Sequence, residues 1–144
     1  MACNTGLFDD YLTELNYYKN LLKNKNNLKM ICTNPDLVVD RGEKREYCAG
    51  TIASIFQEVG GKVEYFGKPY PLVYTLSANV KNKKILCIGD NLNTDIKGAN
   101  NLNLDSLFIT NGVHRSEFKE EHELEKLLKK YNVRSNYFQS ELIW

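Results

Sequence analysis

The chain has 144 residues, of which 42% are apolar and 26% are charged, so it is long enough to fold around a buried core. Its formal net charge is +1, without a basic stripe or an acidic tail, which argues against a nucleic-acid groove or an anionic membrane surface as a partner. The N-terminus has no basic segment followed by an apolar run, and no apolar stretch reaches membrane-spanning length. We therefore expect a cytoplasmic protein with no nucleic-acid and no membrane partner.

The first part of the chain, residues 1–61, predicts helices around short strands. Leucines at helical spacing behind Asp9-Asp10 predict an amphipathic helix over about 9–24. Residues 28–33 form an apolar run that ends at Asn34-Pro35-Asp36, which is typical of a strand meeting a turn. A second short extended piece is expected at "LVVD" and a helix at 47–61, with Gly60-Gly61 as its stop.

Residues 62–144 alternate between apolar strands and helices, and this alternation predicts a parallel α/β sheet. Strand 84–89, "KILCIG", is apolar at successive positions, as expected of a strand covered on both faces. The remaining elements are predicted strands at 62–67 and 105–112, and helices at 69–80, 93–103 and 116–131. The last stretch, "SNYFQSELIW", is expected to dock by its aromatic residues.

The four cysteines do not form a metal-binding pattern. They show no C-x-x-C spacing and have no histidine pair nearby, which argues against a zinc site. Cys32 and Cys87 lie inside apolar strands, and we interpret them as small buried apolar residues.

Two aspartates follow the strand 84–89, in a loop that leads into a helix. In open α/β sheets ligands bind at the carboxyl ends of strands, and Gly89-Asp90 occupies that position. Asp95 lies five residues further on, near the helix N-terminus, and Thr94 is expected to cap that helix. Two carboxylates at a strand end favour Mg²⁺, which binds one or two protein carboxylates together with water and phosphate.

Lys68 follows a different strand after a single glycine. A lysine at such a junction can hold a phosphate or a nucleophilic carboxylate as a point charge. Alone, Lys68 would be read as a solvated surface residue and Asp90 as part of a capping turn. Together, Lys68, Asp90 and Asp95 predict a site for a phosphorylated small molecule and Mg²⁺.

These motifs resemble those of the haloacid dehalogenase (HAD) superfamily, specifically its subfamily IIA phosphatases, which include proteins similar to 4-nitrophenylphosphatase and phosphoglycolate phosphatase. "GKPYPLVY" resembles the third motif of that family, "IGDNLNTDIKGAN" the fourth, "ICTNPDLVV" a segment of its cap domain and "FITNGVH" its last-strand turn. The resemblance covers the chain from about residue 6 to its end.

The resemblance implies a fold and a role for each site residue. Residues 1–61 would be the C-terminal part of the cap, and residues 62–144 the C-terminal half of the HAD core. The fold class is thus α/β, a partial Rossmann-like parallel sheet with a remnant of an α/β cap. Lys68 would steady the phosphate and the nucleophile, Asp90 would ligate Mg²⁺, and Asp95 would ligate Mg²⁺ or orient its waters. Asn34 and Asp36 would lie in the cap as substrate-binding candidates, although an Asx-type turn before Pro35 explains them equally well.

The chain departs from the family in one respect. Members carry a D-x-D motif whose first aspartate attacks phosphorus and whose second acts as acid and base. No D-x-D occurs at any position of the given sequence. Asp9 and Asp10 do not form one, because they are adjacent. Without that strand the edge of 84–88 would be unpaired and apolar. We therefore expect the isolated chain to be inactive as a phosphatase.

Three interpretations remain open from the sequence. The chain is half of a split phosphatase that works with a separately encoded N-terminal half; or it is a non-catalytic remnant of an active ancestor; or it is a protein-interaction module that self-associates through the unpaired edge.

Overall fold

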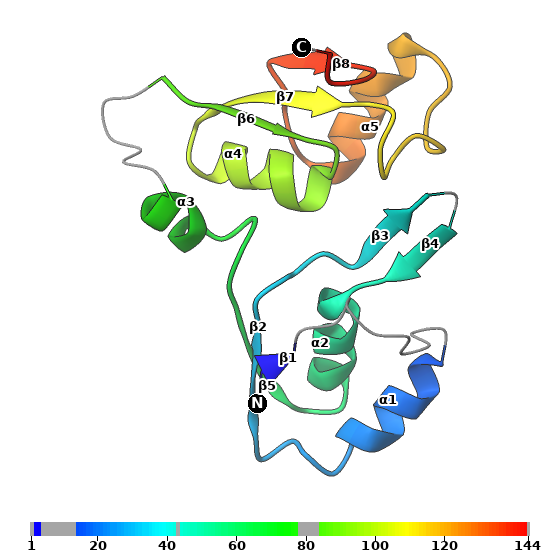
Figure 1. Ribbon diagram of the computed structural model, residues 1–144, viewed down its shortest axis with the longest axis vertical. Coiled ribbons are helices and arrows are strands. Elements are labelled where there is room, and N and C mark those ends of the chain that lie inside the picture. Colours follow the sequence, from blue (N-terminus) through cyan, green and yellow to red (C-terminus); the bar gives the residue numbers. More distant parts are fainter. Residues whose placement is uncertain (1, 4–13, 43, 78–83, 144) are drawn as a thin grey trace. The chain divides into compact units, whose positions relative to one another are not determined.

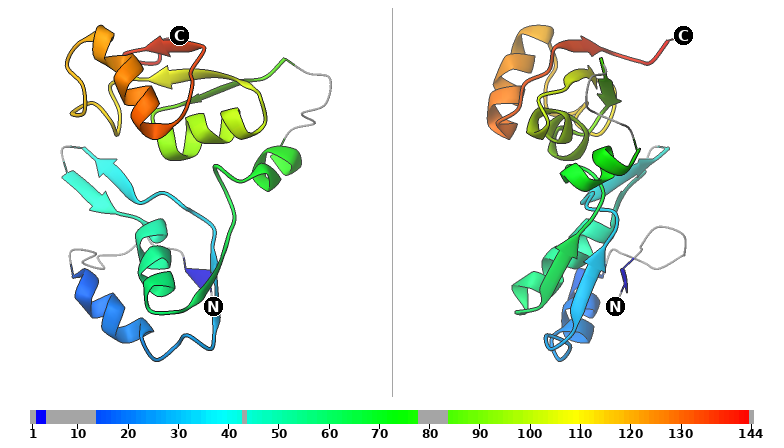
Figure 2. Two further views of the ribbon diagram at one scale, coloured as in Figure 1. Left: turned by 180° about the vertical axis from the view of Figure 1, so that it is seen from behind. Right: turned by 90° about the vertical axis from the view of Figure 1, so that its left-hand side faces the viewer.

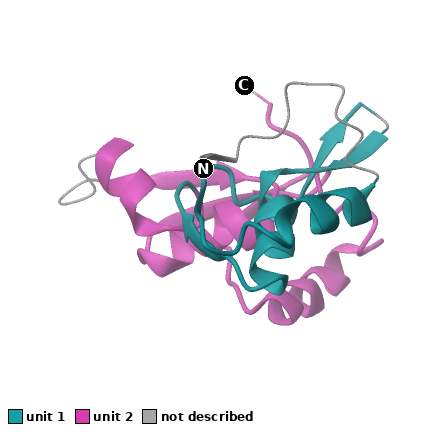
Figure 3. Ribbon diagram, turned by 90° about the horizontal axis from the view of Figure 1, so that it is seen from below, with its two compact units in different colours: residues 1–67 teal, residues 68–144 magenta. Residues whose placement is uncertain are grey.

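The computed structural model describes residues 2–3, 14–42, 44–77 and 84–143 (Figure 1). It divides into two compact units, Met1–Gly67 (unit 1) and Lys68–Trp144 (unit 2), which Figure 3 shows in different colours. The predicted helix start at Asp9-Asp10 and the predicted helix end at 78–80 lie outside the described residues. Mixed helices and parallel strands make up both units, which confirms the predicted α/β class.

Unit 1 contains a parallel sheet with two helices (Figure 1). The strands run in the order β1-β2-β5, and α2 packs on β2 and β5 while α1 packs on α2. Their bounds are β1 Ala2–Cys3, α1 Leu15–Leu22, β2 Lys29–Cys32, α2 Ala49–Glu58 and β5 Lys62–Tyr65. The helix α2 ends where predicted, because Gly60 adopts a φ of +89°.

The core of unit 1 follows from alternation along β2. Met30 and Cys32 are buried, whereas Lys29 and Ile31 on the opposite face are exposed. Burying apolar side chains in this way supplies roughly 25 cal/mol per Å² of apolar area removed from water. The predicted burial of Cys32 is confirmed. The other buried members of the cluster are Leu22, Ala49, Ile52, Ala53, Ile55 and Phe56.

A two-stranded antiparallel hairpin, β3 Val38–Arg41 and β4 Lys44–Tyr47, completes unit 1. The extended piece at "LVVD" was predicted, whereas the charged strand β4 was not. Asp40 and Arg45 are directly paired across the hairpin, and the guanidinium donates from Nε and Nη2 to the two carboxylate oxygens at 2.8 and 3.2 Å. This bidentate pair is a cross-strand contact in a hairpin whose strand β4 is mostly charged.

The boundary between the two compact units lies later in the chain than the boundary between residues 61 and 62 that was predicted from the sequence. The sequence grouped strand 62–67 with the later α/β segment, but β5 pairs in parallel with β2 and belongs to unit 1. The boundary between the compact units falls after Gly67, because the backbone hydrogen bonds of β5 go to β2.

Unit 2 contains a second parallel sheet, with strands in the order β6-β7-β8. The elements are α3 Pro71–Ser77, β6 Leu86–Gly89, the π-helix Leu92–Ile96, α4 Lys97–Asn101, β7 Asp105–Ile109, the 3₁₀ turn Glu121–Glu123, α5 Leu124–Tyr131 and β8 Tyr137–Gln139. The helix predicted over 116–131 begins later than expected, and the helix predicted from Pro69 begins at Pro71 after a cis Lys68–Pro69 peptide. The predicted docking of the C-terminal aromatics takes the form of strand β8, although Tyr137 and Phe138 stay about half exposed.

The core of unit 2 lies between the sheet and its helices. Phe108 on β7 is fully buried, and the other buried members of this cluster are Leu92, Ile96, Leu124 and Leu127. Phe118, Leu128, Tyr131 and Val133 pack against it and are partly buried. Figure 2 shows α4 and α5 beside the sheet from two further directions. This core fixes the loops at the carboxyl ends of β6 and β7.

Strand β6 lies at an edge of this sheet and, within the described residues, pairs only with β7 (Figure 1). The expectation that both faces of β6 are covered is wrong, since Leu86 is 46% and Ile88 is 43% exposed. Cys87, predicted to be buried, is only partly so.

The described helices are short, and none of them combines the length and apolar character that crossing a membrane requires.

Candidate active site

Lys68 and Asp95 are in direct contact within unit 2. The Lys68 ammonium donates to Asp95 Oδ1, and the two groups form an ion pair. The Asp95 side chain is 9% exposed, whereas the Lys68 side chain is 47% exposed. The segment that carries Lys68 is also anchored from α4, because Asn101 Nδ2 donates to Pro69 O at 3.1 Å. The structure thus brings together two of the residues that the sequence predicted as a site.

The loop after β6 folds into a wide helical turn that holds Asp95. Asn91 O accepts hydrogen bonds from Asp95 N at 2.9 Å and from Ile96 N at 3.2 Å, as in a π-helix. The Asp95 carboxylate turns back along the chain, and its Oδ2 accepts from Asn91 N at 3.1 Å. One oxygen of Asp95 therefore binds the loop backbone and the other binds Lys68.

The residue that caps this turn is Asn91. Its side-chain oxygen accepts from Asn93 N at 2.9 Å, so the prediction that Thr94 is the cap is wrong. Thr94 is instead buried, with 4% exposure. The physical reason is that the turn begins at Leu92, one residue before the predicted helix start, so that its cap falls at Asn91, three residues before Thr94.

Gly89 has a specific steric role. A Cβ at this position would lie 2.2 Å from Asp95 Cγ, so the space that any other side chain would need is filled by the Asp95 carboxyl group. The group that approaches the Gly89 backbone is therefore Asp95 itself.

Asp90 is oriented by the turn that follows β7. Its Oδ2 accepts from Val113 N at 2.9 Å, and a Cβ on Gly112 would lie 2.2 Å from the same oxygen. Among the described residues we find no further hydrogen bond to Asp90, so Oδ1 is available to a ligand. The residues Gly112 and Val113 were missed as contributors to the site, although the "TNGVH" turn was noted as a motif.

Two further groups beside Asp95, the Tyr74 hydroxyl and the Cys87 thiol, are neutral at physiological pH. Burial, followed by the proximity of Cys87 and Asp95, raises the pKa of Tyr74 to about 12. Burial, followed by the Asp95 charge, also raises the pKa of the Cys87 thiol. Neither side chain adds a negative charge, so Lys68 is the cation that balances the nearly buried Asp95 carboxylate.

The residues present fit a magnesium ion held by few protein ligands. The described residues contain no group of three or more His, Cys, Asp or Glu side chains able to enclose a metal. Mg²⁺ does not require such a group, because it binds one or two carboxylates and keeps several waters. Asp90, with one oxygen anchored and the other available, suits a direct ligand, and Asp95 suits a residue that holds Lys68 and water.

Asn34 and Asp36, the predicted substrate-binding residues, lie in unit 1 and form an Asx turn. Asn34 Oδ1 accepts from Asp36 N at 3.1 Å across Pro35. Asp36 O in turn accepts from Gly50 N at 3.0 Å, at the start of α2. The turn alternative weighed from the sequence therefore describes their local geometry, and substrate binding by these two residues stays a prediction.

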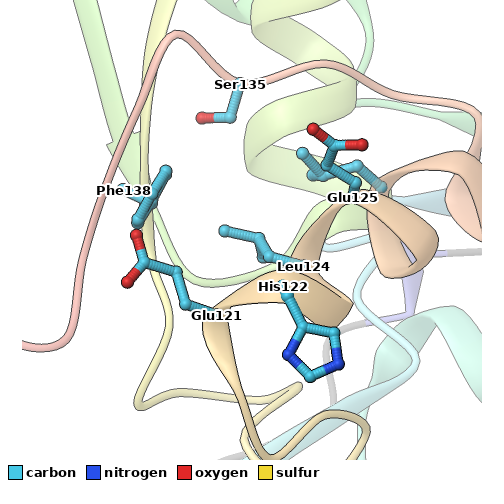
Figure 4. Close-up of a pocket in the computed structure, with 7 residues that line it drawn as sticks. Glu121, His122, Leu124, Glu125, Ser135 and Phe138 are labelled. Atoms are coloured by element: carbon cyan, nitrogen blue, oxygen red, sulfur yellow. The ribbon is translucent and has the colours of Figure 1, made fainter.

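A separate pocket of about 850 Å³ lies beside α5 in unit 2 (Figure 4). Apolar, acidic and other polar side chains line it; the lining residues are Glu121, His122, Leu124, Glu125, Leu128, Ser135 and Phe138. None of the predicted site residues lines this pocket.

Comparison with known proteins identifies the family. The family model described as HAD-hydrolase-like matches residues 65–136, a segment that contains Lys68, Asp90 and Asp95. The chain belongs to the HAD-hydrolase-like family. The resemblance predicted from the sequence motifs is thereby confirmed at the level of the family.

Similar proteins of this family are longer than the chain. An acid sugar phosphatase of Staphylococcus epidermidis is 28% identical over 97 residues, which cover 65% of this chain and 38% of that protein. A HAD-like hydrolase from Brucella suis is 31% identical, with a TM-score of 0.76 over 99% of this chain and 55% of that one. A p-nitrophenyl phosphatase from Archaeoglobus fulgidus shares the fold at 14% identity, with a TM-score of 0.66 over 97% of this chain and 52% of that one. The chain thus spans about half the length of these solved structures.

Proposed function

We propose that this chain supplies the phosphate-binding lysine and the magnesium-binding carboxylates of a HAD phosphomonoesterase that acts on a phosphorylated small molecule. The aspartyl nucleophile would come from a D-x-D strand that lies outside these 144 residues. The observation that carries the proposal is the contact between Lys68 and Asp95, next to an Asp90 carboxylate that is held at the end of β6. Membership of a hydrolase family supports the same assignment.

Each residue would have a distinct task. The Lys68 ammonium has three donors, so it can keep its bond to Asp95 while it holds a phosphoryl oxygen. Asp95 would keep that ammonium charged and oriented. Asp90 would ligate Mg²⁺ through Oδ1, and the ion would neutralise charge on the phosphoryl oxygens. The chain offers no D-x-D aspartate to attack phosphorus, and lysine and metal alone do not replace that group.

The edge of β6 supports a partner strand at this site. Leu86 and Ile88 are exposed on a strand that, among the described residues, pairs on one side only. A strand bearing D-x-D could pair in parallel with the unpaired side of β6. Its carboxyl end would then lie beside Gly89 and Asp90, because the carboxyl ends of parallel strands lie on the same side of a sheet. Self-association through β6 is the alternative use of the same edge.

The first experiment measures Mg²⁺ binding by the chain alone, by NMR titration. We expect the Asp90 and Val113 amide signals to shift with Mg²⁺, and Asp90→Asn to abolish that response. Asp105→Asn is the matched control, because Asp105 is exposed and lies at the opposite end of β7 from the loop. Mg²⁺ shifts that persist in Asp90→Asn would refute the metal role of Asp90.

The second experiment measures hydrolysis of 4-nitrophenyl phosphate. We expect no turnover by the chain alone, and Mg²⁺-dependent turnover when a polypeptide bearing a D-x-D strand is co-expressed with it. Lys68→Met in the same mixture should remove that turnover. Robust Mg²⁺-dependent turnover by the isolated chain would show that the nucleophile lies within these 144 residues and would overturn the proposal.

A further inference from the structure

His114 is a buried histidine in the turn that follows β7. Its residue exposure is 3%, and its ring packs edge-on against Tyr131 with centroids 4.7 Å apart. The centroid of the Phe108 ring lies 6.3 Å from the centroid of the His114 ring. A buried imidazole needs hydrogen-bond partners for both of its nitrogens, and both are supplied here.

The partners of His114 define its tautomer. Leu92 N donates to Nε2 at 3.1 Å, and a nitrogen that accepts a hydrogen bond cannot carry the proton. Nδ1 lies 2.6 Å from Glu117 Oε1, so Nδ1 is the protonated nitrogen and donates to the carboxylate. His114 is therefore a neutral imidazole whose acceptor points at the loop that carries Asp90 and Asp95.

The hydrogen bond to Leu92 completes a set of three. The consecutive amides of residues 91, 92 and 93 open the π-helix and have no helical acceptor of their own. Asn91 N donates to Asp95, Asn93 N donates to the Asn91 side chain, and Leu92 N donates to His114. Two of these acceptors, Asp95 and Asn91, belong to the loop itself, whereas His114 lies in the turn after β7.

The residue before His114 holds the other end of the same loop. Val113 N donates to Asp90 Oδ2 at 2.9 Å. Val113 and His114 are consecutive, so one turn contacts both the Asp90 side chain and the Leu92 amide. Glu117 links this turn to α5, because its carboxylate also accepts hydrogen bonds from the Lys130 ammonium at 2.6 Å and from the Tyr131 hydroxyl at 2.9 Å. The turn thereby connects α5 to the metal-binding loop.

We propose that His114 is a positioning residue, which fixes the Leu92 amide through Nε2 and thereby sets the orientation of Asp90 and Asp95. The consequence for Mg²⁺ rests on the proposed function, whereas the bond between His114 and Leu92 does not. His114 itself touches neither the metal nor the phosphate in this scheme.

The tautomer can be measured on the unaltered chain. The sequence contains two histidines, so side-chain ¹⁵N spectra contain few signals, and the exposed His122 serves as the internal reference. We expect His114 to carry its proton on Nδ1 and an unprotonated Nε2 at neutral pH. A proton on Nε2 would overturn the proposal without any substitution.

Variants then test the link to the loop. In His114→Leu we expect exchange of the Leu92 amide to accelerate roughly tenfold or more, because a buried donor loses its acceptor. His114→Gln should restore part of that protection, since its amide oxygen can accept in place of Nε2. His122→Gln, on an exposed side chain, should leave Leu92 exchange unchanged.

Mg²⁺ affinity measured on the same variants should fall in His114→Leu and recover in His114→Gln. Unchanged Leu92 exchange in His114→Leu, or unchanged Mg²⁺ affinity despite faster exchange, would overturn the positioning role. If the unaltered chain binds no Mg²⁺, the proposed function fails, and with it the link from His114 to the metal, while the exchange data still decide the contact with Leu92.

Discussion

Replacing Glu117 by glutamine tests the network that supports the turn 112–117. Burial works against ionisation of Glu117, but hydrogen bonds from Lys130, His114 and Tyr131 outweigh it and lower the pKa of this carboxyl to about 2. Glutamine keeps a similar shape and an oxygen acceptor but removes the charge. We therefore expect Glu117→Gln to destabilise unit 2 at neutral pH.

The magnitude follows from the gap between the usual carboxyl pKa of 4.5 and the value of about 2. At about 1.4 kcal/mol per pH unit the gap corresponds to at most ~3.5 kcal/mol. Lys130 is 63% exposed, so solvent screening reduces the expected loss to about 1–2 kcal/mol. Because the pKa is lowered on folding, this stabilisation is present above pH 4.5 and is lost as the pH falls toward 2.

The assay is urea unfolding of both proteins from pH 7 to pH 2, followed by the NMR signals of Tyr131 so that unit 2 is observed. The difference in free energy of unfolding should be present at pH 7 and vanish near pH 2. Glu125→Gln is the control on α5, the helix that carries Lys130 and Tyr131, since the pair of Glu125 with Lys129 is 3.9 Å long and both side chains are more than three-quarters exposed. A difference between Glu117→Gln and the unaltered chain that does not change with pH would refute the reasoning.

Two further predictions concern close contacts of glycines. In Gly112→Ala the new Cβ would lie 2.2 Å from Asp90 Oδ2, so Asp90 must leave Val113; we expect Mg²⁺ affinity to fall roughly tenfold, and unaltered amide shifts at Asp90 would contradict this. In Gly98→Ala the Cβ would lie 1.9 Å from the Tyr74 hydroxyl, so we expect unit 2 to lose about 1–3 kcal/mol, and less in a Tyr74→Phe background. Strictly additive effects in that double-mutant cycle would contradict the contact.

The sequence predicted those elements whose signal is local. The apolar runs that became β2, β6 and β7 were found, and so was the stop of α2 at Gly60. Strand β4 was missed because three of its four residues are charged, and its pairing with β3 includes the contact between Arg45 and Asp40. Strand β8 was missed because it depends on hydrogen bonds to β7, about 30 residues earlier in the chain.

The candidate site shows the same division between local and distant signals. Lys68, Asp90 and Asp95 were recognisable by their positions after strands, and the structure brings Lys68 to Asp95. The contact between His114 and Leu92 was not recognisable, because the two residues lie 22 positions apart in the sequence. The steric role of Gly89 was likewise hidden, since it depends on how the Asp95 carboxyl folds back over the strand end.

The wide turn at Leu92–Ile96 constrains how this loop can change in evolution. A π-turn holds one residue more than an α-turn, so deletion of the exposed Asn93 could be absorbed by ordinary α-helical hydrogen bonding, with α4 left intact. The same deletion would rotate the Asp95 side chain by about 100° around the helix axis and away from Lys68. Substitutions at position 93 should therefore be tolerated among homologues, whereas a change in the length of the loop should not.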